Sequence, residues 1–241
     1  MSKKAIIIGA SSGIGREVAQ RLIADGWTVG IAARRLEKLE ELRQQHPQQV
    51  VTQTIDVTTP EAPKLLLQLI NDTGGMDLYF HASGIGKQNH LLEPDIEQQT
   101  VRTNALGFVQ LVDTAFNYMA EHGGGHIAAI TSIAGTKGLG PAPSYSATKA
   151  FQNTYLQALE QLANARQLNI RFTDLRPGFV DTALLNDGNR YPMLLRPEAV
   201  AREMTQAIAH RRHIRVIDWR WRILTAFWRR IPRFIWRKIK L

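Results

Sequence analysis

Two hydrophobic patterns alternate along the first 217 residues of the chain. Short apolar runs rich in β-branched residues predict strands, and longer stretches with apolar residues at helical spacing predict helices. This alternation predicts a doubly wound α/β domain, a parallel sheet of about seven strands with helices on both faces. The predicted strands lie within 5–9, 27–33, 50–56, 76–82, 126–132, 169–175 and 213–218, and the predicted helices within 15–25, 36–45, 62–72, 97–121, 144–166 and 197–210.

The composition narrows the classes of protein that this chain can represent. It contains no cysteine, which excludes disulfides, thiol nucleophiles and thiolate metal sites and is compatible with a reducing compartment. The first apolar run ends at Gly9, which is too short for a secretory signal, and no uncharged apolar stretch reaches the length of about 18 residues that spans a bilayer. We therefore expect a cytoplasmic protein.

The positive charge of the chain is concentrated at its end. The net charge is +9, but residues 211–241 hold eleven of the 30 Lys and Arg residues and only one acid, Asp218. The first 210 residues hold 19 basic and 20 acidic residues and are nearly neutral. Such asymmetry predicts a local interaction surface. We divide the chain into a catalytic domain, 1–218, and a basic tail, 219–241.

A glycine-rich segment follows the first predicted strand and opens the first predicted helix. Glycines allow a tight turn and a close approach to a pyrophosphate, and the helix N-terminus offers free N–H groups to phosphates. The position between a strand and a helix makes this segment typical of a dinucleotide-binding loop. The expected cofactor-binding residues here are Gly9, Ser11, Ser12, Gly13, Ile14 and Gly15.

Two arginines follow the second predicted strand. At this place an NAD-binding fold often has an acid for the ribose hydroxyl, whereas this chain has Arg34 and Arg35, which attract a 2′-phosphate. The alternative is that both are simply solvated at the start of a helix. The residues favour NADP(H) as the cofactor.

Further motifs complete a family pattern. They are Asn104 in "RTNALG", Ser132 in "ITSIAG", Tyr145 and Lys149 in "YSATK", and "RPGFVDT" at 176–182. With the glycine spacing of 9, 13 and 15, the chain from Lys3 to about His210 resembles the short-chain dehydrogenase/reductase family. The resemblance implies a Rossmann-like fold, NADP-dependent reduction of a carbonyl or oxidation of an alcohol, and a homodimer or tetramer assembled through the helices predicted within 97–121 and 144–166.

Tyr145 and Lys149 carry the predicted chemistry. Four residues apart on a helix, they share one face, although such a pair is also common on a solvated surface. The resemblance implies that Tyr145 donates a proton and that Lys149 also holds the nicotinamide ribose. Lowering a phenol pKa from about 10 to about 7 takes about 4 kcal/mol, which one cation about 4 Å away can supply. We therefore predict that Lys149 lowers the pKa of Tyr145.

Two more catalytic positions come from the resemblance. It implies that Ser132 hydrogen-bonds the substrate oxygen, while a strand-end serine that satisfies a turn is the alternative. Asn104 lies inside a predicted helix, where asparagine is a modest helix former. The resemblance implies a local distortion at Asn104 that holds a water for proton transfer to and from Lys149.

The remaining cofactor contacts are also implied by the resemblance. Where the family commonly reads Asn-Asn-Ala-Gly, this chain has His81-Ala82-Ser83-Gly84, in which Ala82 and Ser83 are small enough for close approach. We interpret His81 as a buried core residue and expect no metal site. For Thr182, ordinary loop structure is the alternative. The expected contacts are Asp56 and Val57 to the adenine, Ala82, Ser83 and Gly84 to its ribose, Asn104, Tyr145 and Lys149 in the site, and Pro177, Gly178, Val180 and Thr182 near the nicotinamide.

Two segments near the end of the chain, 182–197 and the tail, indicate the kind of substrate and partner. The segment 182–197 stands where the family places its substrate loop, and its leucines favour an apolar substrate. The tail predicts one or two amphipathic helices, with Pro232 favouring two. Its apolar face can pack on the body or cover the substrate pocket, form a subunit contact, or lie in an anionic membrane interface. That face is predicted to contain Ile223, Leu224, Phe227, Trp228, Ile231, Phe234, Ile235 and Ile239.

A different class of function is also open at this point. The fold can serve as a non-enzymatic NADPH-binding module whose basic tail binds membrane or nucleic-acid phosphates. Against it, Ser132, Tyr145, Lys149 and Asn104 fill all four catalytic positions with competent residues. We therefore favour the enzyme and do not expect nucleic acid as a partner.

Overall fold

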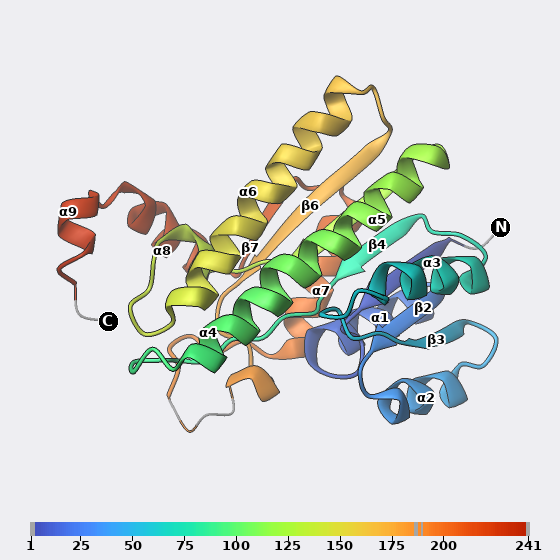
Figure 1. Ribbon diagram of the computed structural model, residues 1–241, viewed down its shortest axis with the longest axis horizontal. Coiled ribbons are helices and arrows are strands. Elements are labelled where there is room, and N and C mark those ends of the chain that lie inside the picture. Colours follow the sequence, from blue (N-terminus) through green and yellow to red (C-terminus); the bar gives the residue numbers. More distant parts are fainter. Residues whose placement is uncertain (1–2, 186–187, 189, 240–241) are drawn as a thin grey trace.

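A single parallel sheet forms the centre of the molecule (Figure 1). The computed structural model describes residues 3–185, 188 and 190–239. The sheet has seven strands in the order β3-β2-β1-β4-β5-β6-β7, which confirms the predicted class and all seven predicted strands. The strands are β1 Lys4–Ile8, β2 Thr28–Ala33, β3 Val50–Thr54, β4 Leu78–His81, β5 Gly125–Ile130, β6 Ile170–Pro177 and β7 Ile214–Ile217.

Helices cover both faces of the sheet because its strands are apolar on both sides. One hydrophobic cluster joins the sheet to α1 (Gly13–Ala24), α2 (Leu36–Gln45) and α7 (Pro197–Ala209). A second cluster joins the other face to α3 (Ala62–Thr73), α5 (Gly107–Glu121) and α6 (Pro143–Ala165). The apolar residues whose spacing predicted these helices are therefore the residues that the helices bury against the sheet.

The chain reverses its winding direction between β1 and β4, which are neighbours in the sheet. Ile8 is paired with His81, so the turns that follow the two strands begin side by side. In open parallel sheets, this crevice at the carboxyl ends of the strands is where ligands bind. The glycine segment and the segment 82–86 both start there.

The helix predicted within 97–121 is interrupted. It consists of α4 (Pro94–Val101), a π-helical turn η1 (Arg102–Leu106) and α5. The amide nitrogen Nε2 of Gln152 on α6 donates to the carbonyl of Asn104, 2.8 Å away, and so occupies a carbonyl inside the distorted turn. The local distortion expected at Asn104 is confirmed.

The tail forms two helices, as Pro232 predicted. These are α8 (Trp219–Arg230) and α9 (Arg233–Trp236), and Pro232 is the residue that precedes α9. Figure 1 shows them projecting from the body on the left of the view. Within the residues that the structure describes, no helix is both long enough and apolar enough to cross a membrane.

Candidate active site

The glycine loop is packed tightly against the turn after β4. Gly9 has a positive φ of +93°, and a Cβ atom there would lie 2.6 Å from the backbone nitrogen of Ser83. A Cβ at Gly15 would collide with the carbonyl of Gly9, and one at Gly13 would lie 3.3 Å from the methyl of Thr182. Three predicted cofactor segments, distant in the sequence, therefore meet at one place.

The start of α1 has the features of a phosphate site. No acid lies in its first turn, and Ser12, the residue before the helix, makes no side-chain hydrogen bond to it. The hydroxyls of Ser11 and Ser12 instead accept hydrogen bonds from Arg35, at 2.9 Å and 2.8 Å. A helix N-terminus with free N–H groups and a nearby guanidinium fits the phosphates of a dinucleotide.

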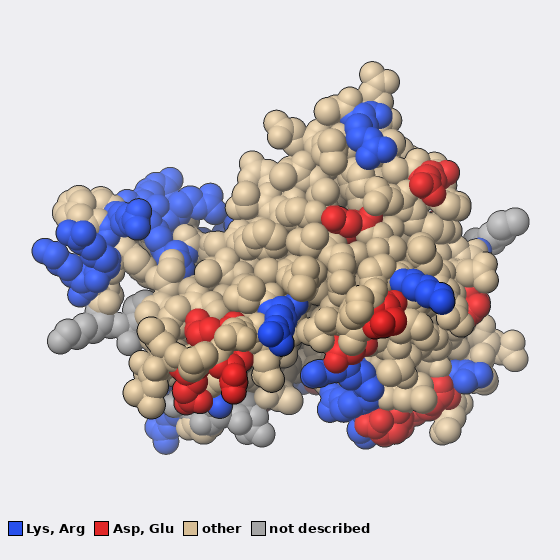
Figure 2. Space-filling view, in the orientation of Figure 1, with Lys and Arg blue, Asp and Glu red and all other residues tan. Residues whose placement is uncertain are grey.

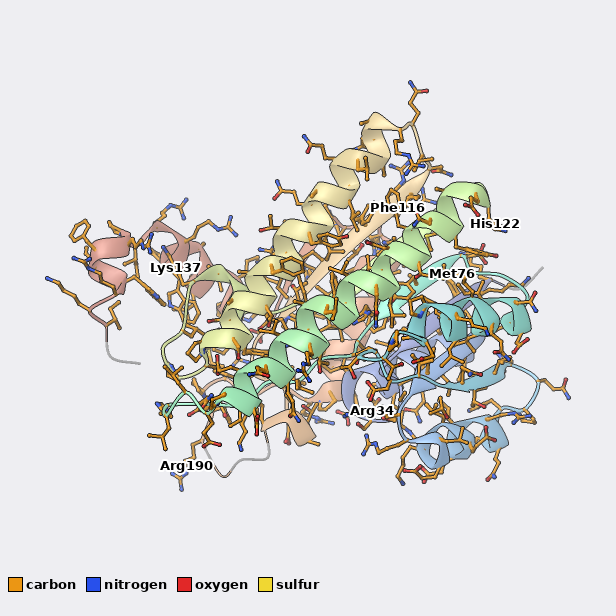
Figure 3. The ribbon with its side chains drawn as sticks, in the orientation of Figure 1. Arg34, Met76, Phe116, His122, Lys137 and Arg190 are labelled. Atoms are coloured by element: carbon orange, nitrogen blue, oxygen red, sulfur yellow. The ribbon has the colours of Figure 1, made fainter. Side chains whose placement is uncertain are left out.

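The end of β2 is positively charged, as the sequence predicted. Arg34 and Arg35 are both exposed, and Arg34 is labelled in Figure 3. Burial raises the pKa of Asp56, but hydrogen bonds from Thr58 and the charge of Arg34 outweigh burial and lower it. Asp56 is therefore ionised, and Arg35 lies against the glycine loop.

Tyr145, Lys149 and Ser132 converge at the first turns of α6. The nitrogen Nζ of Lys149 lies 5.7 Å from the centre of the Tyr145 ring. Ser132 precedes a short 3-10 turn, η2 (Ile133–Thr136), and its hydroxyl accepts a hydrogen bond from the nitrogen of Ala134 at 3.0 Å. The same hydroxyl acts to lower the pKa of Tyr145, which places it near the phenol. Ser132 thus satisfies a turn and also faces the phenol.

The electrostatics of this group differ from the prediction. Burial raises the pKa of Tyr145, and the Ser132 hydroxyl offsets only part of that rise. Burial lowers the pKa of Lys149 to about 8, against the opposing effect of Asp174. The prediction that Lys149 makes Tyr145 acidic is wrong for this structure, because desolvation dominates at both groups. Tyr145 therefore holds its proton at neutral pH and is placed to donate it.

Asn104 holds the turn after β4. Its side-chain oxygen accepts from the nitrogen of Ile85 at 2.9 Å, and its side-chain nitrogen donates to the carbonyl of Ile85 at 2.7 Å. The backbone carbonyl of Asn104 accepts from Gln152. In this structure Asn104 positions the turn after β4, and the water that the resemblance implies at this residue stays a prediction.

Two residues of the site were missed by sequence reasoning. Gln152 is fully buried, and its oxygen Oε1 accepts from Lys149 at 3.0 Å. A Cβ at Gly86 would lie 2.5 Å from the ring of Tyr145, so only glycine leaves room for that ring. Gln152 lies three residues after Lys149, a helical spacing that could have revealed it. Gly86 carries no such signal.

His81 is a core residue, as interpreted. It is fully buried, and the hydroxyl of Tyr79 lies 2.8 Å from its Nδ1. Burial lowers the pKa of His81 to about 3, and the charge of Lys149 acts in the same direction. His81 is thus neutral. Among the described residues, no group of three or more His, Cys, Asp or Glu side chains is placed to hold a metal.

The segment after β6 connects the glycine loop to the tail. The nitrogen of Gly178 donates to the carbonyl of Ile217 at 2.9 Å, so Pro177 and Gly178 stay beside β7. Val180 pairs with Leu195, which closes the base of the predicted substrate segment. Of that segment, residues 186, 187 and 189 lie outside the described residues.

Two other predicted cofactor positions have structural partners. Val57 is buried, and a Cβ on Gly107 would lie 2.6 Å from its carbonyl. A Cβ on Gly84 would lie 3.5 Å from Nζ of Lys149 and 3.4 Å from the side-chain oxygen of Asn104. Gly84 therefore lies directly beside the buried lysine.

Comparisons with known proteins show the family and the fold of this chain. The family model described as short chain dehydrogenase matches residues 3–191. An uncharacterized oxidoreductase of Mycobacterium tuberculosis is 31% identical over 191 residues, covering 76% of this chain and 75% of that one. An uncharacterized oxidoreductase of Staphylococcus aureus is 30% identical over 221 residues, covering 89% and 94%. The crystal structure of a short-chain dehydrogenase from Streptomyces avermitilis superposes with a TM-score of 0.83 at 21% identity, over 94% and 92% of the two chains.

The chain belongs to the short-chain dehydrogenase family. It is accordingly an oxidoreductase, and its family uses a nicotinamide cofactor.

Proposed function

We propose that this protein is an NADPH-dependent oxidoreductase that interconverts a ketone or aldehyde with its alcohol. The observation that carries the proposal is the convergence of Ser132, Tyr145 and Lys149 beside the glycine loop. The preference for NADPH over NADH rests on Arg34 and Arg35, which leave no acid at the end of β2 to repel a 2′-phosphate.

Each residue of the site has a defined task in this reaction. NADPH, when bound, would supply the hydride. Ser132 and Tyr145 present two hydroxyls that hold the carbonyl oxygen of the substrate. Because burial keeps Tyr145 protonated, it could donate its proton to the substrate oxygen once that oxygen carries negative charge. The ammonium of Lys149 then stabilises the phenolate that remains.

The cofactor would be held by residues that the structure brings together. The glycine loop and the start of α1 would face the pyrophosphate, and Asp56 and Val57 would face the adenine. Lys149, Pro177, Gly178, Val180 and Thr182 would surround the nicotinamide end. The substrate would be apolar, which fits the exposed Leu184 and Leu194 beside this end of the site.

The chain also has a surface suited to a second copy of itself. Val101, Leu106, Phe151 and Leu162 are exposed apolar residues of α4, η1 and α6. Figure 2 shows that the face over α5 and α6 is mostly uncharged. We propose a homodimer or tetramer through this face. Light scattering should give a mass at least twice 27.1 kDa for the chain and a smaller mass for Leu106→Glu with Phe151→Glu.

The test of the enzyme is NADPH oxidation against a panel of apolar and polar carbonyl compounds. Tyr145→Phe removes the proton donor and keeps the ring, so we expect it to lose about 10²-fold or more in kcat/KM while binding NADPH normally. A chain that binds NADPH but reduces no carbonyl, or a Tyr145→Phe variant with full activity, would favour the non-enzymatic binding module instead.

A further inference from the structure

The tail is fixed to the body by one of its sides. Trp221 is fully buried, and its ring lies 5.4 Å from that of Phe179. Trp228 continues the contact at 6.4 Å from Trp221, and Trp236 of α9 lies 5.8 Å from Trp228. The prediction of the apolar face is therefore wrong in one respect. It leaves out Trp221, the residue that anchors the tail to the body.

Two hydrogen bonds also hold the tail in place. Lys137, labelled beside the tail in Figure 3, donates to the carbonyl of Ile231 at 2.9 Å. The indole nitrogen of Trp236 donates to the carbonyl of Gly138 at 2.7 Å. Both partners follow η2, the turn that begins next to Ser132. The tail therefore presents a defined outer side at the edge of the active site.

The outer side of the tail combines large apolar residues with arginines. Figure 2 shows Lys and Arg gathered on this arm, and residues 219–239 contain no acid. Six large apolar side chains here are 42–66% exposed, a set unusual for a surface in water. They are Trp219, Ile223, Phe227, Phe234, Ile235 and Ile239, and the basic residues are Arg220, Arg222, Arg229, Arg230, Arg233, Arg237 and Lys238.

We infer that this outer side of α8 and α9 binds the surface of an anionic lipid bilayer. Apolar and aromatic side chains would enter the boundary between headgroups and acyl chains, and arginines would pair with lipid phosphates. Three of the exposed apolar residues are isoleucines, which suit acyl chains and cannot stack on nucleic-acid bases. A second copy of the tail is a poor partner for this surface, because the seven basic residues of each copy would repel those of the other.

The experiment is co-sedimentation of the full chain with vesicles of phosphatidylcholine, with and without phosphatidylglycerol. A truncation is unsuitable because it would remove the buried Trp221. The test variant is Ile223→Ser with Phe227→Ser, which changes only exposed residues of α8. The matched control is Leu67→Ser, an exposed leucine of α3 on the body. Circular dichroism checks that each variant is folded.

We expect the chain to bind the anionic vesicles and to release them as salt rises. The double variant should lose about ten-fold or more in partition coefficient, and Leu67→Ser should lose nothing. Arg229→Gln and Arg230→Gln should each cost about five-fold. Absence of binding to anionic vesicles, equal binding by the double variant, or a tail that binds only DNA or a second copy would overturn the inference.

The position of this surface has a consequence that rests on the proposed function. Phe179 contacts Trp221 and lies two residues after Pro177, so the tail adjoins the nicotinamide end of the site. A lipophilic carbonyl would then reach the site from the bilayer. The double variant should reduce such a carbonyl more slowly from anionic vesicles and should reduce a water-soluble carbonyl as fast as the wild type. If the double variant reduces both compounds at the wild-type rate, delivery from the bilayer is contradicted. If neither the wild type nor the variant reduces any carbonyl, the proposed function is contradicted.

A second inference is carried by Gln152. Its carboxamide links two elements of the site, because Oε1 accepts from Lys149 at 3.0 Å and Nε2 donates to the carbonyl of Asn104 at 2.8 Å. Lys149 also donates to the carbonyl of Ile130 at 3.1 Å. We propose that Gln152 is a positioning residue that fixes the ammonium of Lys149 between α6 and the π-helical turn.

The test rests on the proposed role of Lys149 in holding the cofactor. Gln152 itself is uncharged. The ionisable groups that act on or face this ammonium are Tyr145, Asp174 and His81. We compare NADPH affinity against pH for the wild type, Gln152→Glu and Gln152→Leu. NADPH affinity should fall at high pH, where Lys149 loses its proton, and we call this fall the upper limb of the profile. A carboxylate beside the ammonium should move the upper limb to higher pH by about one unit or more. Leucine, which accepts no hydrogen bond, should move it to lower pH.

A purely structural role would weaken binding without moving this limb. Coincident limbs in all three proteins therefore overturn the role of Gln152. A wild type that does not bind NADPH at any pH would instead overturn the proposed function.

Discussion

The ammonium of Lys149 lies 5.7 Å from the centre of the Tyr145 ring, one helical turn away on α6. The two groups depart from their ordinary pKa values in opposite directions, since burial raises that of Tyr145 and lowers that of Lys149. Both changes favour the neutral form. The site therefore holds a protonated phenol next to a lysine that titrates near pH 8, an arrangement suited to giving a proton away.

Lys149 should make the stability of the fold depend on pH. Its pKa is about 8 in the folded chain, against an ordinary value of 10.5 for a solvated lysine, so the unfolded chain binds more protons between these values. Stability from this group is thus lowest below pH 8 and rises as pH increases to about 10.5. Relative to Lys149→Met, the wild type should gain at most about 1.4 kcal/mol per pH unit in this window.

Urea unfolding of both proteins at pH 7, 8, 9 and 10 measures this difference, because contributions of other groups cancel. Curves that stay parallel across the window would show that Lys149 keeps an ordinary pKa in the folded chain.

Arg35 should determine the choice between NADPH and NADH. It is exposed and donates to the hydroxyls of the glycine loop, so a 2′-phosphate would find a guanidinium already oriented. Arg35→Ala should weaken NADPH binding by about 10- to 100-fold and change NADH binding much less. Arg43→Ala is the matched control, because Arg43 is an exposed arginine of α2 paired with Glu40. An unchanged ratio of the two dissociation constants would refute the assignment.

The sheet could be predicted because its information is local. Apolar runs such as that of β1 must be buried on both faces, and the glycines that follow β1 indicate the turn and the helix. The same reasoning located Tyr145 and Lys149 on one helix face. It failed on their pKa values, because desolvation depends on what the fold places around them.

Two of the residues that the sequence did not reveal, Gly86 and Trp221, have a common physical cause. Gly86 matters only because the Tyr145 ring, 59 positions away in the chain, comes to lie against it. Trp221 is absent from the apolar face predicted for the tail, and only the fold places Phe179 beside it. Such contacts are long-range and leave no periodic trace in the sequence.

Gly86 should be required for activity more than for folding. A Cβ would lie 2.5 Å from Cδ2 and 2.7 Å from Cε2 of Tyr145, so the ring has to move. A displacement on the order of 1 Å at the proton donor should lower kcat/KM by about 100-fold in Gly86→Ala. Gly140→Ala is the control, since nothing lies within 4 Å of its added methyl. Steady-state kinetics alongside thermal melts separates the two effects, and full activity in Gly86→Ala would show that the ring tolerates the methyl group.

Trp221 should make the tail part of the folded core. It is fully buried against Phe179, and its indole nitrogen has no hydrogen-bond partner among the described residues. Trp221→Ala leaves a large cavity and should cost about 3–5 kcal/mol of unfolding free energy. Trp221→Phe should cost clearly less, because it keeps an aromatic ring and removes a buried donor without an acceptor. Trp219→Ala, on an exposed tryptophan of the same helix, should stay within about 0.5 kcal/mol of the wild type. Chemical denaturation measures all three, and equal costs for the alanine variants of Trp221 and Trp219 would mean that α8 is not docked on the body in solution.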